Sequence, residues 1–351
     1  FSLYLFSESL DPDEDAEIWA FLTLTYGIRP ASNMATCGLK KVVNIKKDEY
    51  PLAHEVVHKQ TYMDDTGGGH STKEGREKII NELVSVLPLG GFSIKMITRS
   101  GEPPGEKASN DGVTSSFGGY AWKTEKDTMS YKSGEINFNR KQRGYKKPNE
   151  KPLETEEDVR ELVKDIVLTR RKLLGKVLEN FDLIGIFEPL KVRYKMGLHL
   201  LSGLDYDELI PEELREIWTN NLVLMHMSKD LEVDRSVVHE DAIDPDSLEL
   251  ICCADAASTM YGAAIYVRSK LKDGSYSVKL LTARSRTSRL TIPRNELLGC
   301  VLVSETAFVA VKSLGDRVKK IIFVTDSSAA LCWISNLDLK LKQFVFARVQ
   351  H

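Results

Sequence analysis

The sequence has few cysteines, and no two of them have the CxxC spacing that is typical of zinc and redox sites. Any disulfide scheme would leave one of the five unpaired, so a disulfide-stabilised secreted domain is disfavoured. A reducing compartment is the simpler interpretation. The five are Cys37, Cys252, Cys253, Cys300 and Cys332.

Long apolar runs are also missing. No segment approaches the roughly 18 to 20 apolar residues that are needed to cross a bilayer. The first residues, FSLYLF, are too short for the apolar part of a signal peptide and lack its basic start. The sequence therefore predicts neither membrane insertion nor secretion.

The chain carries no large net charge. Its 351 residues include 48 Lys and Arg against 51 Asp and Glu, a formal charge of −3, so no cationic field surrounds the whole molecule. With 28% charged and 42% hydrophobic residues, the composition is that of an ordinary folded protein and excludes wholesale disorder. The length predicts two or three domains at roughly 150 residues each.

A local basic run is the candidate for contact with nucleic acid. Residues 140–147, RKQRGYKK, contain five cations and one aromatic ring. Arg143 and Lys146 could hold phosphates while Tyr145 stacks on a base. A solvated loop is the more common role of such a run, so both interpretations stay open.

The order of the expected elements divides the chain into four parts. We expect a mixed helical and strand region at 1–101, a loop-rich linker with a hairpin at 102–152, helices at 153–240 and a further layer at 245–351. The last part reads strand, strand, strand, helix, strand, helix, which is typical of a mixed sheet covered by helices. The sequence therefore predicts a multidomain α/β and α+β protein.

Three local expectations follow from periodicity. Apolar spacing predicts helix over 16–43 with a break at 27–30, a strand at 90–97 entered through a glycine turn, and a buried strand at 321–325.

The missing initial Met and the end of the chain within a pattern indicate a piece of a longer protein.

Two adjacent carboxylates mark the first candidate site. Tyr62-Met63-Asp64-Asp65 is expected to be a strand that ends in a tight turn. Adjacent carboxylates repel, but Asp64 and Asp65 together could hold a divalent cation, because hard oxygen ligands suit Mg²⁺. In two-metal phosphoryl transfer such ions lie about 3.5–4 Å apart. A solvated acidic turn is the alternative.

Three separate carboxylates mark the second candidate site. Asp255 and Asp326 each follow an apolar strand, and Glu296 lies in the first turns of the long helix between them. Sites in α/β sheets lie at the carboxyl ends of strands, so the three could converge on a divalent metal. Singly, Asp326 reads as a helix N-cap, and Glu296 merely favours the positive end of its helix.

Two peptidase motifs compete with these interpretations. His54-Glu55-Val56-Val57-His58 matches HExxH, which on a helix places two imidazoles on one face for zinc. The extended zinc pattern is not continued, because Thr61 and Asp64 stand where its Gly and His belong. Asp65-Thr66-Gly67 is the triplet of retroviral-type aspartic proteases, but the charged Asp64 replaces the apolar residue that usually precedes it.

Taken together, the motifs resemble those of a BEL/Pao-type long-terminal-repeat retrotransposon polyprotein. The resemblance covers the C-terminal part of its reverse transcriptase and the ribonuclease H that follows. The order and spacing of many matches carry this resemblance. The segments are Tyr26–Ser32 (FGxxxSP), Tyr62–Asp65 (YxDD), Gly90–Lys95 (GGFxxK), Gly119–Trp122 with Asp127 (LGxxW…D), Thr169–Arg171 (TKR), Phe181–Gly185 (FDPLG), Leu204–Asp207 (WDD or WDE), Asp255–Ser258 (DAS), Pro293–Leu297 (PRxEL) and Thr325–Ser327 (TDS).

This resemblance implies a reverse-transcriptase palm remnant, a helical connection and a ribonuclease H-like mixed sheet. It implies that Asp64 and Asp65 bind the polymerase metals, and that Asp255, Glu296 and Asp326 bind Mg²⁺ or Mn²⁺ for the nuclease. The implied partners are an RNA template, a DNA primer, dNTPs and an RNA–DNA hybrid, in the cytoplasm or within virus-like particles. The implied nucleic-acid contacts are Tyr62, Gly90, Gly91, Phe92 and Lys95.

Departures from the family pattern limit the expected activity. The first polymerase aspartate of the family would lie before residue 1, and the fourth nuclease carboxylate would lie after His351. Ser32 and Leu183 replace prolines of the family motifs. We therefore expect weak or absent polymerisation by these 351 residues. A catalytically dead remnant that still binds nucleic acid is a further hypothesis.

Overall fold

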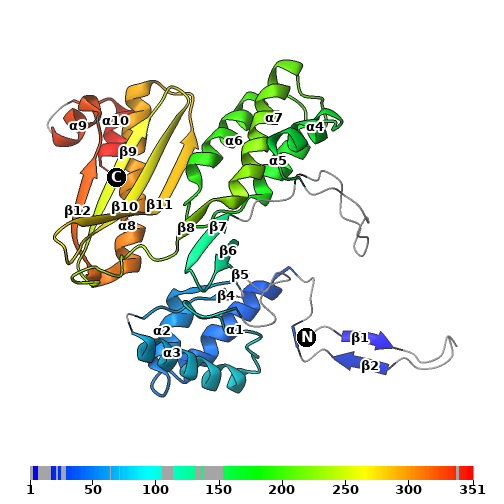
Figure 1. Cartoon of the computed structure of the whole chain (residues 1–351), viewed down its shortest axis with the longest axis vertical. Coiled ribbons are helices and arrows are strands. Elements are labelled where there is room, and N and C mark those ends of the chain that lie inside the picture. The colour runs from blue at the N-terminus through cyan, green and yellow to red at the C-terminus, as the bar shows by residue number, and fades with distance from the viewer. Residues whose placement is uncertain are drawn as a thin grey trace. The chain divides into compact units, whose positions relative to one another are not determined.

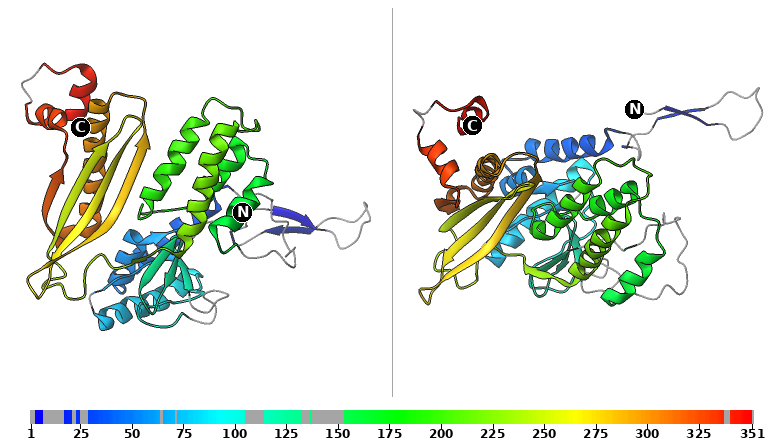
Figure 2. Two further views of the ribbon diagram at one scale, coloured as in Figure 1. Left: turned by 45° about the horizontal axis from the view of Figure 1, so that its top comes forward. Right: turned by 90° about the horizontal axis from the view of Figure 1, so that it is seen from above.

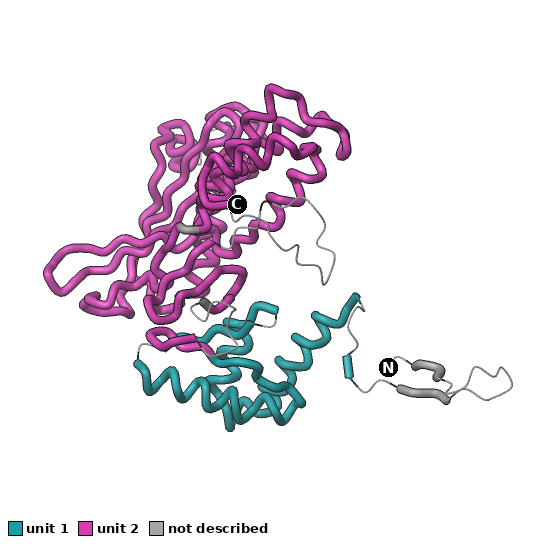
Figure 3. The backbone as a smooth tube through the Cα atoms, turned by 45° about the vertical axis from the view of Figure 1, so that its right-hand side comes forward, with its two compact units in different colours: residues 1–97 teal, residues 98–351 magenta. Residues whose placement is uncertain are grey.

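The computed structural model describes residues 3–6, 17–20, 23–24, 29–63, 65–70, 72–104, 114–131, 136, 153–336 and 340–350. The chain forms two compact units, residues 1–97 and 98–351 (Figure 3). Each unit has its own hydrophobic core.

In the first unit, helices pack around a small apolar core (Figure 1). Pro51 occupies the first turn of α2, where its missing N–H costs nothing, and the Thr72 hydroxyl caps α3 by accepting from the Gly75 amide at 3.1 Å. The core residues are Val43, Ala53, Val57, Val86 and Leu87. The elements are β1 (Leu3–Phe6), β2 (Glu17–Ala20), α1 (Ala31–Ile45), α2 (Pro51–Lys59), β3 (Thr61–Tyr62), β4 (Asp65–Thr66), α3 (Lys73–Val86) and the 3₁₀ turn η1 (Leu87–Gly90).

Two of the local expectations for this unit are wrong. Residues 17–20 pair with β1 as an antiparallel strand instead of forming a helix. Residues 92–99 form no strand, because Gly91 ends the 3₁₀ turn at φ +77° and no described strand pairs with the segment that follows. Alternating apolar residues make a strand only where a neighbour satisfies the backbone groups.

The second unit begins with a small antiparallel sheet that joins distant segments. Its strands are β5 (Thr114–Phe117), β6 (Tyr120–Lys123), β7 (Thr128–Tyr131) and β8 (Glu232–Asp234), in that order. Because β8 follows the helical segment, the predicted linker and the end of the helical part share one sheet. The predicted boundaries near 101, 152 and 240 stay predictions, and the two units part between residues 97 and 98.

Between β7 and β8 the chain forms a helical layer. Thr155 starts α4 with a capping box, in which its hydroxyl accepts from the Asp158 amide and the Asp158 carboxylate accepts from the Thr155 amide. Trp218, Tyr194 and Leu222 are almost completely buried at the centre of the layer. The helices are α4 (Glu156–Lys164), α5 (Arg170–Glu179), α6 (Glu188–Leu200), α7 (Glu212–Met227) and the 3₁₀ turn η2 (Ser228–Asp230).

The C-terminal layer is a four-stranded mixed sheet in the order β11-β10-β9-β12. Only β12 runs parallel to its neighbour, and α8 packs against the sheet (Figure 2). Burial alternates along β9, as expected for a strand with one core face. The prediction of a mixed α/β fold is confirmed. The elements are β9 (Leu248–Ala256), β10 (Met260–Lys270), β11 (Tyr276–Thr287), α8 (Ile292–Leu314), η3 (Gly315–Arg317), β12 (Val318–Val324), α9 (Ser328–Ser335) and α10 (Gln343–Val349).

The prediction of a buried strand at 321–325 is wrong in its burial. In the described part of the chain, β12 pairs with β9 alone and forms an edge of the sheet. Ile321, Phe323 and Val324 are therefore 42–55% exposed. An apolar run by itself does not show whether a strand is central or at an edge.

Helix α8 corrects the expectation that no segment is apolar enough to span a bilayer. Within Ile292–Arg317, a stretch of 18 residues has a mean hydropathy of 1.7, so the segment could cross a membrane by length and composition alone. Their apolar character has another role, because Leu302, Val303 and Ala307 are buried in the core that α8 forms with the sheet. A core helix meets the same criteria as a membrane span, so α8 gives no reason to place the protein in a membrane.

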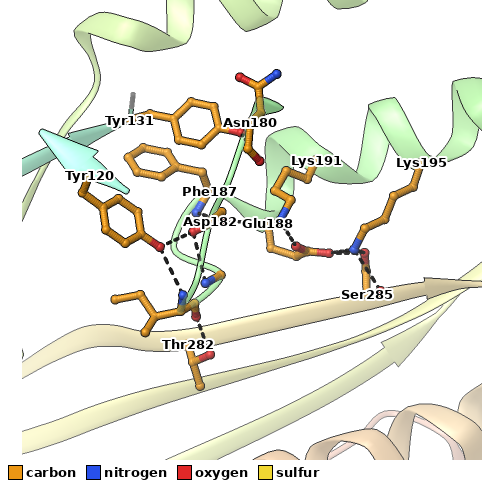
Figure 4. Close-up of polar contacts among 12 residues, drawn as sticks. Tyr120, Tyr131, Asn180, Asp182, Phe187, Glu188, Lys191, Lys195, Thr282 and Ser285 are labelled. Atoms are coloured by element: carbon orange, nitrogen blue, oxygen red, sulfur yellow. Dashed lines mark hydrogen bonds and ion pairs between the residues drawn. The ribbon is translucent and has the colours of Figure 1, made fainter. Parts of the chain in front are cut away.

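A buried carboxylate organises the turn between α5 and α6 (Figure 4). The carboxylate of Asp182 accepts the Tyr120 hydroxyl at 2.5 Å and the backbone amides of Gly185 and Phe187 at 3.1 Å. Burial raises the pKa of Tyr120 well above its ordinary value, and the hydrogen bond to Asp182 raises it further, so the phenol stays a donor. The small sheet and the helical layer are joined at this point.

The same turn covers the free edge of β11. The Thr282 hydroxyl donates to the Ile184 carbonyl at 2.5 Å, and Glu188 accepts from both Ser285 and Lys195. The Lys195 ammonium also donates to the Ser285 carbonyl at 3.0 Å. An exposed strand edge invites pairing with other chains, and here α6 and its preceding turn occupy it.

A close backbone contact of this interface requires a glycine, and we expect Gly185→Ala to destabilise the second unit. Gly185 has φ +76°, and a Cβ there would lie 1.9 Å from the Ala283 carbonyl oxygen. Backbone strain and overpacking together should lower the free energy of unfolding by about 2 kcal/mol or more. Chemical denaturation of the full chain measures the change.

Gly175→Ala is the matched control. Gly175 is exposed in α5, and a Cβ there would meet nothing within 4 Å. This substitution should be neutral or stabilise by up to about 1 kcal/mol. Equal stability of the two variants would contradict the close approach of Gly185 to β11.

Candidate functional site

Two of the predicted carboxylates lie at the same edge of the mixed sheet. Strands β9 and β12 are parallel, and Val324 is the register partner of Cys253. Asp255 lies two residues beyond Cys253, and Asp326 lies two residues beyond Val324. Both acids are exposed, and their backbones emerge from the carboxyl ends of neighbouring parallel strands.

Glu296 reaches that edge from α8. The Ser327 hydroxyl donates to the Glu296 carboxylate, next to Asp326 in the chain. A Cβ on Gly299, one turn after Glu296, would lie 3.4 Å from the Asp255 carbonyl oxygen. The first turns of α8 therefore lie against the ends of both strands, and the fold brings the three predicted segments together.

The side chains themselves do not form a closed metal site. In the segments that the structure describes, no group of three or more His, Cys, Asp or Glu side chains could hold a metal ion. Asp255 instead accepts from the Ala256 amide at 2.7 Å, and Glu296 accepts from Ser327. The three carboxylates supply the oxygen atoms that Mg²⁺ or Mn²⁺ prefers, but their role as metal ligands stays a prediction.

Asn295 is a site residue that sequence reasoning missed. It is completely buried, and its amide nitrogen donates to the Ala257 carbonyl at 2.9 Å. This bond ties α8 to the turn that follows β9, beside Glu296. The sequence did contain a signal for it. An uncharged polar residue in the apolar first turns of a core helix is buried, and its polar atoms then need a hydrogen-bond partner.

The cysteines near this edge are unsuited to nucleophilic chemistry. Burial raises the pKa of the Cys300 thiol, and the nearby Glu296 carboxylate raises it further, against a hydrogen bond with Thr325. Burial, with a contribution from Cys253, raises the pKa of Cys252 to about 11. Since the thiolate is the reactive form, these residues act as small core side chains.

The hairpin with adjacent aspartates forms as predicted in the first unit. Tyr62 pairs with Asp65 in an antiparallel pair of two-residue strands, and Met63 takes a left-handed conformation at φ 53°. The hydroxyls of Thr61 and Thr66 lie 3.0 Å apart across the same pair of strands. Asp64 lies outside the described residues, so only Asp65 of the predicted metal pair has a described position.

The predicted nucleic-acid contacts differ in their surroundings. Phe92 packs against the core of the first unit, which gives its ring a structural role, while Lys95 is exposed. Gly90 fits closely against Val42, and Gly91 needs its freedom for φ +77°. Arg143, Tyr145 and Lys146 lie outside the described residues.

The peptidase interpretations are not favoured by the geometry. The carboxylate of Glu55 bonds Lys59 at 2.9 Å, whereas His54 and His58 both bond Asn44. A zinc peptidase needs that Glu beside the metal as a general base. Asp65 of the aspartic-protease triplet pairs with Tyr62 in a two-residue strand.

The comparisons identify the class of domain at the sheet edge. Residues 169–327 match the model of the Pao retrotransposon-like RNaseH-like domain. The matched segment is similar to this family, and the predicted resemblance to a Pao-type retrotransposon polyprotein is confirmed. The match includes Asp255, Glu296 and Asp326. No curated protein matches the chain.

Among solved structures, the chain is similar to two foamy viral proteins. One is the protease-reverse transcriptase dRH in complex with double-stranded DNA, at 13% identity and a TM-score of 0.49, covering 96% of this chain and 49% of that one. The other is the protease-reverse transcriptase in complex with double-stranded DNA, at 13% identity and a TM-score of 0.42, covering 90% and 54%. The chain thus spans about half the length of the proteins it resembles.

We expect Ser327→Ala to loosen the edge of the sheet at which the carboxylates lie. The Ser327 hydroxyl accepts from the Ala330 amide at 3.1 Å, which caps α9, and donates to Glu296. Loss of both bonds should cost about 1–2 kcal/mol in the free energy of unfolding. Ser328→Ala, at the exposed next position, should cost less than about 0.5 kcal/mol. Equal losses in the two variants would contradict the assigned bonds.

Proposed function

We propose that the C-terminal part of the chain is a ribonuclease H that cleaves the RNA strand of an RNA–DNA hybrid. The observation that carries the proposal is the family match, because it spans all three carboxylates whose segments meet at one edge of the sheet. The hybrid would be recognised through its backbone and 2′-hydroxyls, with little reading of base sequence. The protein would act in the cytoplasm or within virus-like particles.

The proposal assigns Asp255, Glu296 and Asp326 to the binding of divalent metal. Bound Mg²⁺ or Mn²⁺ would polarise the phosphate and activate water in such a nuclease. Since the described side chains do not close around an ion, rotation of Asp255 and Glu296 away from their present hydrogen-bond partners is required. No individual step of the reaction is assigned to a single carboxylate.

The test is cleavage of a labelled RNA–DNA hybrid by the full chain with Mg²⁺ or Mn²⁺. Asp255→Asn, Glu296→Gln and Asp326→Asn should each lower the rate by at least about 100-fold, because each removes a charged metal ligand. Asp316→Asn, at an exposed turn before β12, should leave the rate unchanged. Chelation of the metal should stop the reaction.

Cleavage that survives all three substitutions would contradict the proposal. A chain that binds the hybrid with strong salt dependence but never cleaves it would be a remnant that only binds nucleic acid. Both outcomes are read from the same preparation, by gel assay and by a binding titration at two salt concentrations.

A second proposed function is RNA-directed DNA polymerisation, and the Tyr62–Asp65 hairpin favours it. Asp65 pairs with Tyr62 in this hairpin, and the sequence places a second aspartate, Asp64, directly before it, a combination that suits the binding of Mg²⁺ with a dNTP and a primer end. The same fold region supplies Lys95 at an exposed position for a phosphate. The activity of the whole polyprotein is part of this proposal, because the chain spans about half of its structural relatives.

Primer extension on an RNA template tests the second function. We expect weak extension by the chain, which the double substitution of Asp64 and Asp65 by Asn should lower by about 100-fold or more, because both charges that hold the metals are lost. The Asp48→Asn substitution, in the turn after α1, is the control. Extension that is indifferent to the double substitution would rule out the hairpin as a polymerase site.

A further inference from the structure

Three side chains on α1 and α2 point at one another in the first unit. The Nε2 atoms of His54 and His58 lie 3.0 Å and 2.8 Å from the Oδ1 atom of Asn44. The two histidines are four residues apart on α2, so they share one face of the helix, and their ring centroids are 4.6 Å apart. Asn44 belongs to the last turn of α1.

The spacing of these atoms is that of ligands around one metal ion. Transition metals bind imidazole nitrogen at about 2.0–2.1 Å and oxygen at about 2.0–2.2 Å. Two such ligands at a right angle are then about 3.0 Å apart, which agrees with both distances to Asn44. An ion between the three atoms needs each imidazole in the tautomer that carries its proton on Nδ1, which leaves the Nε2 lone pair for the metal, and small rotations of the side chains.

The surroundings leave the two histidines accessible to an ion and place Glu55 against another partner. His58 is exposed, so an ion can enter from solvent. Glu55 pairs with Lys59 instead, so the glutamate of the motif is not placed as a general base for peptide hydrolysis.

We propose that His54, His58 and Asn44 form a binding site for a single divalent transition-metal ion of the nitrogen-preferring class, such as Zn²⁺ or Ni²⁺. Water would complete its coordination. The ion would cross-link α1 to α2 and stabilise the helices that lead into the Tyr62–Asp65 hairpin. This site differs in chemistry from the carboxylate edge and does not depend on the proposed nuclease or polymerase function.

The experiment is a calorimetric titration of the metal-free full chain with Ni²⁺ and, separately, with Zn²⁺. We expect one site that is lost in the double variant with His54→Gln and His58→Gln, and that binds at least about tenfold more weakly in Asn44→Ala. Glutamine keeps a donor for Asn44, so the helices should remain folded. His239→Ala, in the second unit, should bind as the unchanged chain does.

Thermal unfolding gives a second readout. If the two histidines only joined the helices through hydrogen bonds to Asn44, added metal would not change the melting temperature. Saturating metal should raise the melting temperature of the unchanged chain and of His239→Ala, but not that of the double glutamine variant. Absence of binding by the unchanged chain, or equal binding by the double variant with the same circular dichroism, would overturn the proposal.

Discussion

The buried carboxylate of Asp182 is the interaction on which the second unit depends. One side chain satisfies a tyrosine hydroxyl from the small sheet and two amides at the start of α6, and the turn it shapes lies against β11. Burial of an unpaired carboxylate would be very costly, whereas three donors make the same burial stable. The small sheet and the helical layer therefore meet at Asp182, and the mixed sheet joins them through the neighbouring Ile184 and Glu188 (Figure 4).

The consequence for function is the fixed position of the mixed sheet. The turn after α5 covers β11 at one edge, while Asp255 and Asp326 follow strands near the opposite edge. The family match begins at residue 169 and ends at residue 327, so it includes the helices that hold β11 as well as the sheet. The match therefore covers α5, α6 and α7 together with the sheet, and the close approach of the Ala283 carbonyl requires glycine where the two surfaces touch at Gly185.

The candidate sites use different chemistries in different environments. Exposed carboxylates at the sheet edge suit hard cations and phosphate, while the imidazoles of His54 and His58 suit softer metals. The HExxH motif had predicted the second kind of chemistry for a peptidase. The geometry favours metal binding by the histidines and not peptidase activity. The histidines converge on Asn44, whereas the glutamate bonds Lys59.

Local patterns in the sequence determined much of this protein: the capped start of α4, the long helix after Thr291, the hairpin at Tyr62–Asp65 and the acids that follow β9 and β12. These features depend on residues close together in the chain, where periodicity, caps and turn residues decide the structure. Only the tertiary structure decided that β12 is exposed, that residues 92–99 form no strand, and that Asp182 and Asn44 receive their partners. Each of those outcomes depends on which distant segment of the chain lies alongside. The free energy of such a pairing depends on both segments, so it cannot be predicted from a short stretch of sequence.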